Sequence, residues 1–94
     1  MTVGLSAPAA AADIEAGAAL ARRWCADCHV VGPGQAAGRA DGVPAFQAIA
    51  DARTTSADGL RGLLSGPHGR MPDLSLTRRE QDDLIAYILG LRAR

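Results

Sequence analysis

The sequence predicts a small all-α domain of three to four helices, and three observations lead to that class. The chain has 94 residues, the length of one small domain. No stretch alternates apolar and polar residues with the period of two of a β-strand. Four segments instead carry helix caps or apolar residues spaced three and four apart. A chain this short usually needs a disulfide, a metal or a cofactor, and a single Trp, Tyr and Phe offer little bulk for its centre.

The residues before Asp13 fall outside the predicted domain. Residues 1–12 are small, apolar and uncharged in their side chains, and they end in Ala10-Ala11-Ala12. This resembles the tail of a secretory signal peptide, although a basic region and a full apolar stretch are missing. The alternative is a disordered, alanine-rich N-terminus. We interpret residues 1–12 as the remnant of an export signal and residues 13–94 as the folded domain.

The first helix is expected from about Asp13 to Asp27, with Asp13 as its cap. The residues that fall near one face of it are Ile14, Ala18, Ala21 and Cys25. Residues 30–43 follow as a loop rich in glycine.

Two short helices are expected next. One runs from Pro44 to about Ala52 and starts with proline at a favoured first position. The other runs from about Ala57 to Leu64, is capped by Thr55 or Ser56, and is stopped by Gly66-Pro67.

The last helix is the clearest in the sequence. An extended loop over residues 68–76 leads into it, and Thr77 and Glu80 form a capping box at its start. Tyr87 lies at the edge of the apolar stripe of this helix. The stripe consists of Leu84, Ile85, Ile88 and Leu91.

The segment Cys25-Ala26-Asp27-Cys28-His29 predicts a covalently attached haem. Two cysteines three residues apart on a helical turn can each form a thioether to one vinyl group of a flat ring. The next residue then projects over the ring, and a histidine there offers a neutral imidazole nitrogen to the iron. We therefore expect one haem c per chain, attached at Cys25 and Cys28, with His29 as an iron ligand.

Other uses of the two cysteines are less consistent with the sequence. A structural disulfide is possible, but a thioredoxin-like redox pair belongs beside a βαβ pattern, which is missing. A zinc site as a rule needs four ligands, and the candidates are Cys25, Cys28, His29 and His68. Adjacent Cys28 and His29 would struggle to reach the same tetrahedral ion.

Met71 is the candidate for the second axial iron ligand. The other methionine, Met1, begins the chain, whereas Met71 lies in a loop between Gly69 and Pro72. The glycine allows close approach of the backbone, and the proline favours an extended conformation at Met71. A thioether favours ferrous iron and raises the reduction potential. Three alternatives remain. Met71 could instead fill an apolar gap, or His68 could be the second ligand, which would lower the reduction potential. If neither residue bound, the open iron would suit a small ligand such as a gas.

Composition excludes several function classes. The ten basic residues, all arginine, balance ten acidic ones, so no basic surface suggests nucleic acid. No apolar run approaches the ~18 residues of a membrane span. No paired carboxylates, nucleophile with a base or phosphate-binding loop is evident, so we expect an electron carrier and no enzyme.

Together these residues resemble the class I cytochrome c family. The resemblance covers about Asp13 to Leu91 and rests on three elements in order. These are Cys25-Ala26-Asp27-Cys28-His29, Met71-Pro72-Asp73-Leu74 and Leu84-Ile85-Ala86-Tyr87-Ile88. The resemblance implies the small cytochrome c fold, with helices and loops wrapped around one haem.

The family also implies a helix crossing. A glycine eight residues before the first cysteine lets the N-terminal helix lie close across the C-terminal helix, and Gly17 occupies that position here. Leu84 and Tyr87 correspond to the contact residues on the last helix. The family often has an aromatic residue four after the glycine, where this chain has Ala21.

The resemblance implies further haem contacts. A proline carbonyl in the loop after the motif accepts a hydrogen bond from the proximal imidazole, which fixes the ring and raises its basicity. Pro44 corresponds to that proline, with Pro33 as the runner-up, and Phe46 would pack near the haem edge. Trp24 either contacts the porphyrin or a propionate, or is a half-exposed helix residue. Candidate propionate partners are Arg39, Arg53 and Arg70.

The expected function is one-electron transfer by a soluble, monomeric, periplasmic carrier. Its partners would be redox proteins that dock transiently at the haem edge. Carriers that resemble mitochondrial cytochrome c often dock through lysines, and this chain has none. The alternatives are an electron-accepting subunit of a periplasmic dehydrogenase and a haem protein that binds a small ligand at an open iron.

Overall fold

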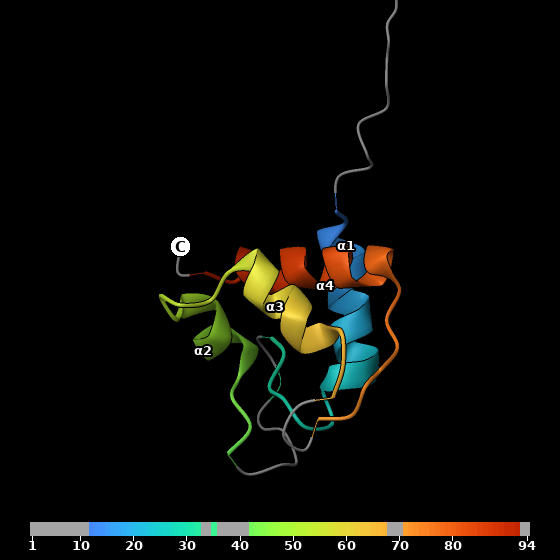
Figure 1. Cartoon of the computed structure of the whole chain (residues 1–94). Helices are drawn as coiled ribbons and strands as arrows, with labels where there is room; N and C mark the ends of the chain where they lie inside the picture. The colour runs from blue at the N-terminus through green and yellow to red at the C-terminus, as the bar shows by residue number, and fades with distance from the viewer. Residues whose placement is uncertain (1–11, 33–34, 36–41, 68–70, 93–94) are drawn as a thin grey trace, which may run out of the picture.

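The computed structural model describes residues 12–32, 35, 42–67 and 71–92, and these residues form helices and no strand. The all-α prediction is confirmed. In order, the elements are α1 (Ile14–Leu20), η1 (Ala21–Cys25), α2 (Phe46–Asp51), α3 (Ala57–Leu64) and α4 (Arg78–Gly90) (Figure 1). In the part of the chain described, no helix has both the length and the apolar character that crossing a membrane requires.

The crossing of α1 and α4 is the largest contact between helices (Figure 1). Gly17 lies where they meet, and a Cβ atom at this position would be 2.0 Å from the carbonyl oxygen of Asp83 and 2.9 Å from the Cβ of Tyr87. Only glycine permits so close an approach. The crossing at Gly17 is therefore confirmed, but the backbone of Asp83, rather than Leu84, provides the nearest atoms beside Tyr87.

The first helix differs in detail from the prediction of one α-helix to Asp27. After α1 the chain widens into the π-helical turn η1, in which the N–H of Ala26 donates to the carbonyl of Ala21, five residues back (3.0 Å). The N–H groups of Cys28 and His29 both donate to the carbonyl of Cys25 (3.1 and 2.9 Å). A π turn adds one residue without altering the apolar character of the face, so the sequence pattern does not reveal it.

The helix predicted from Pro44 begins two residues later, at Phe46. Pro44 lies before it, and Ala45 is an extended N-cap (φ −67°, ψ 148°). The N–H of Phe46 donates to the carbonyl of Val30 (2.8 Å), which ties the helix start to the chain after His29. The interpretation of Pro44 as the first helical residue is therefore wrong.

The last two helices follow the prediction. Ser56, not Thr55, caps α3 by accepting from the N–H of Gly59. Thr77 and Glu80 form the capping box of α4. The apolar stripe of α4 packs into the core, with Leu84 1 % exposed. The other core residues are Ala21, Cys25, Val31, Phe46, Ala50, Leu60, Leu64, Ile85 and Ile88.

Candidate haem site

The turn formed by residues 25–29, called the motif turn below, places its two cysteines in different surroundings. Cys25 is buried in the core and Cys28 is exposed, and both are free thiols. Burial, with Cys28 nearby, raises the pKa of the Cys25 thiol to about 11. Cys25 is therefore a neutral, apolar group at neutral pH, and its conversion to an uncharged thioether would leave the core without a buried charge.

His29 is held by the carbonyl of Pro44. Its Nδ1 lies 2.7 Å from that oxygen. A carbonyl can only accept, so Nδ1 carries the proton and Nε2 keeps the lone pair that binds a metal. The ring is half-buried and lies against Phe46, with ring centroids 5.1 Å apart. Three residues predicted for one site, His29, Pro44 and Phe46, thus lie together.

The backbone that follows His29 is fixed by two side chains that the sequence analysis did not assign to the site. The hydroxyl of Tyr87 donates to the carbonyl of Val31 (2.6 Å), and the amide of Gln35 bonds to the backbone on either side of His29. The sequence predicts Tyr87 at the edge of the α4 stripe and as a contact of the helix crossing, but not as a partner of this loop. No pattern in the sequence points to Gln35, because its partners are backbone atoms that any residue would supply.

Met71 lies at the margin of the core, and Trp24 lies at the surface. Met71 is half-buried and packs against the core cluster that contains Cys25. Trp24 is 54 % exposed, and the guanidinium of Arg23 lies 5.4 Å from its ring centroid, a cation–π contact. Trp24 thus lies at the surface beside Cys25 in the sequence.

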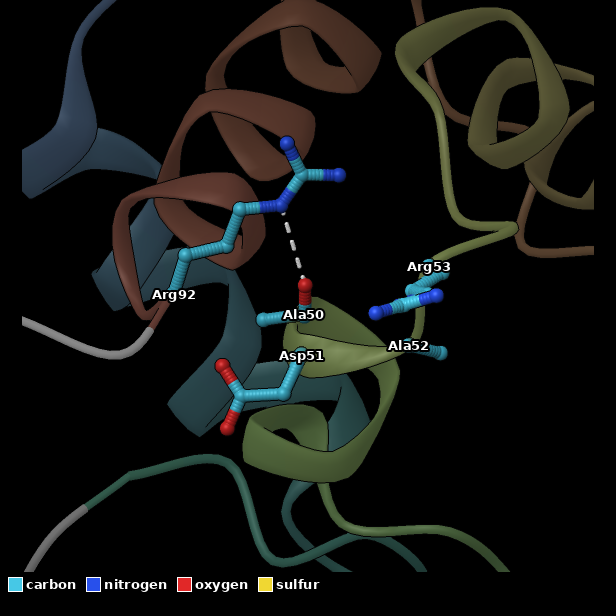
Figure 2. A pocket seen from close by; sticks show the side chains of 5 residues that line it. All are labelled: Ala50, Asp51, Ala52, Arg53 and Arg92. Carbon is cyan, nitrogen blue, oxygen red and sulfur yellow. Dashed lines mark hydrogen bonds between the residues drawn. The ribbon is translucent and has the colours of Figure 1, made fainter.

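Several predicted contacts lie outside the described residues: Pro33, Arg39, His68 and Arg70. Arg53 is described and exposed, and it lines a pocket of about 290 Å³ at the C-terminal end of α2 (Figure 2). Arg92 lines the same pocket and donates to the carbonyls of Ala50 (3.0 Å) and Thr55 (2.7 Å). The structure thus groups Arg53 with this helix end, and none of the described residues predicted to bind the haem iron lines the pocket.

The side chains at this site suit a metal bound within a cofactor that supplies most of the metal's ligands, rather than a bare ion. Within the described residues no three His, Cys, Asp or Glu side chains gather to hold a bare ion. One imidazole with a fixed tautomer, one partly buried thioether and two thiols on a single turn are what a porphyrin iron needs for axial ligation and attachment. The residues therefore fit a haem c.

Comparison with known proteins agrees with this donor set. Residues 12–88 match the family model described as cytochrome c oxidase, cbb3-type, subunit III. The chain is similar to cytochrome c-552 of Bradyrhizobium diazoefficiens, with 48 % identity over 87 residues, which cover 93 % of this chain and 83 % of the relative. No solved structure matches.

Proposed function

This chain belongs to the c-type cytochromes of the cbb3-type oxidase subunit III family. From that premise we propose that it is a periplasmic electron carrier with His29 and Met71 as axial iron ligands. As a small monohaem cytochrome of this kind it carries one covalent haem c and transfers electrons. The haem supplies the one-electron chemistry, since its iron cycles between the ferric and ferrous states. The residues of this chain determine how the haem is held, how its potential is set and where partners reach it.

The hydrogen bond from Nδ1 of His29 to the carbonyl of Pro44 is the observation that carries this proposal (2.7 Å). This bond fixes the tautomer and the orientation of the imidazole, and it makes Nε2 a stronger electron-pair donor to the iron. Phe46 limits rotation of the ring from the side. His29 is thereby preorganised as a permanent ligand, which suits a carrier that must change oxidation state with little rearrangement.

The thiols of Cys25 and Cys28 are proposed as the attachment points. They lie one helical turn apart, with Cys25 facing the core and Cys28 facing solvent. Cys25 would anchor the cofactor in the apolar interior, while the side of the site at Cys28 is accessible from solvent. Transient redox partners would dock on this accessible side.

Met71 is proposed as the second ligand because it packs against the same core cluster as Cys25. Its sulfur would contribute a soft, neutral donor that favours the ferrous state. We further propose that the carrier is exported to the periplasm and acts as a monomer, with Trp24 near the haem.

A redox titration of the Met71→Ala holoprotein tests the ligand assignment. We expect the reduction potential to fall by on the order of 0.1 V, a fraction of the ~0.8 V that axial ligands span. We also expect the reduced variant to bind carbon monoxide, which the wild type resists. Leu76→Ala is the matched control, because it shortens another apolar side chain of this loop that packs on the core.

Two other results would redirect the proposal. A Met71→Ala potential equal to that of the wild type would show that Met71 is not a ligand, and carbon monoxide binding by the wild type would indicate an open iron. The family model is named for an oxidase subunit. Purification of the native protein at fixed stoichiometry with a larger oxidoreductase would therefore show that it is a dedicated electron-carrying subunit and not a free carrier.

A further inference from the structure

Gln35 is bound through its side-chain amide to the backbone on both sides of His29. Its Nε2 donates to the carbonyl of Ala26 (2.9 Å) and to the carbonyl of His29 (2.7 Å). Its Oε1 accepts from the N–H of Val31 (3.0 Å). The orientation of the amide follows from its partners, because two of them can only accept and one can only donate.

These backbone groups need such a partner because the motif turn ends at His29. The last carbonyls of a helical segment have no donors within the segment. In this turn the N–H groups of Cys28 and His29 already bond to the carbonyl of Cys25, so the carbonyls of Ala26 and His29 depend on donors from elsewhere. Gln35 supplies both from one side chain, and so acts as a C-terminal cap for the motif.

The neighbouring backbone groups are held from other elements. The carbonyl of Val30 accepts from the N–H of Phe46 at the start of α2, and the carbonyl of Val31 accepts from the hydroxyl of Tyr87 on α4. Val31 itself is 3 % exposed. Gln35 therefore completes a set of hydrogen bonds that fixes the chain from His29 to Val31, with two bonds to this stretch.

We propose that Gln35 is a positioning residue for the proximal iron ligand, an inference that rests on the proposed function. Pro44 fixes the imidazole of His29 from its Nδ1 side, and Gln35 fixes the main chain from which that imidazole extends. The two contacts come from opposite ends of the residue and together define the direction of Nε2. Without Gln35, water would take over the freed carbonyls and enter beside the site, which favours the more highly charged ferric state.

The wild-type holoprotein provides the first test, by nuclear magnetic resonance of the reduced, diamagnetic state. We expect the two Nε2 protons of Gln35 to exchange slowly with water and to give nuclear Overhauser contacts to Ala26 and His29. Side-chain amide protons that exchange as fast as those of an exposed glutamine would overturn the proposal. This measurement does not depend on whether a variant folds or acquires haem.

The second test replaces Gln35 by an uncharged side chain of similar length, Gln35→Met. Gln81→Met is the matched control, because Gln81 is a glutamine even more buried than the half-buried Gln35, but it bonds to the side chains of Ser65 and Arg61. We expect Gln35→Met to lower the reduction potential, to shift the ring signals of His29 in the ferric spectrum, and to speed amide exchange of Val31 about tenfold. Gln81→Met should leave the potential and the His29 signals at wild-type values, and it should speed Val31 exchange no more than its loss of global stability accounts for.

The outcomes separate this inference from the proposed function. Wild-type protein without haem-shifted signals from His29 would refute the proposed ligation itself. Wild-type protein with those signals, but with Gln35→Met and Gln81→Met alike in potential, His29 shifts and Val31 exchange, would refute only the positioning role of Gln35.

Discussion

The crossing of α1 over α4 and the loops around His29 are held by different kinds of contact. At the crossing, backbone lies directly on backbone, with no room for a Cβ between Gly17 and the carbonyl of Asp83. Around His29, side-chain groups and loop backbone reach across to satisfy backbone atoms, as Gln35 and Tyr87 do. The crossing thus tolerates no added atom, whereas the loops depend on individual hydrogen bonds.

This difference separates the contacts that hold the fold, the scaffold, from the contacts that set how the haem site is arranged. The helix crossing sets the relative positions of the two terminal helices, and it involves none of the groups proposed to touch haem. The loops determine how His29 is presented. Substitutions at the crossing should therefore act on folding, and substitutions in the loops should act on the haem as well as on stability.

The largest effect is expected from Gly17→Val. A Cβ at this position meets the backbone of Asp83, which cannot move aside without shifting α4. We expect the free energy of unfolding to fall by about 3 kcal/mol or more, with poor recovery of holoprotein. Guanidinium denaturation followed by circular dichroism measures this.

Gly62→Ala is the control for that variant. A Cβ at Gly62 meets none of the described atoms outside its own helix within 4 Å, and the residue lies inside α3. Alanine there should raise the free energy of unfolding by about 0.4–1 kcal/mol. A Gly17→Val protein with the same denaturation midpoint as Gly62→Ala would show that the crossing is not closely packed.

An intermediate effect is expected where α4 meets the loop after the motif. Tyr87→Phe removes the donor to the carbonyl of Val31 and should cost about 1–2 kcal/mol of unfolding free energy. Gly32→Ala would place a Cβ 2.6 Å from the same hydroxyl. The alanine should therefore cost less in the Tyr87→Phe background, with a coupling energy of about 1 kcal/mol.

A double-mutant cycle of these two substitutions measures that coupling from four denaturation curves. Gly66→Ala, where a Cβ meets no described atom within 4 Å, replaces Gly32→Ala in the control cycle. Equal costs of Gly32→Ala in both backgrounds would mean that the tyrosine hydroxyl does not lie against this loop.

The smallest effect is expected at the start of α4. Thr77→Ala removes half of the capping box and should cost about 1 kcal/mol of unfolding free energy. The reduction potential should not change, because the cap belongs to the scaffold. Thr54→Ala, at an exposed turn residue, is the comparison and should stay within about 0.5 kcal/mol of wild type. A change of potential in Thr77→Ala would weaken the distinction between scaffold and loops.

The features that the sequence predicted are those with a local pattern. The capping box of α4, the spacing of the motif and the small residue at Gly17 each depend on a few residues close together in the chain. The start of α2 was misplaced because the preference of proline for a first helical turn was outweighed by tertiary bonds at Val30 and His29. Gln35 and the π turn could not be predicted, since both depend on backbone hydrogen bonds that leave no mark on residue type.

The central claim is that haem is attached at Cys25 and Cys28, and peptide mapping of the purified holoprotein tests it most directly. Trypsin cleaves after Arg23 and Arg39, which places both cysteines on one peptide, residues 24–39. We predict that this peptide carries the added mass of one haem and that neither cysteine reacts with an alkylating reagent after denaturation. A peptide of unmodified mass with two alkylated cysteines would contradict the account.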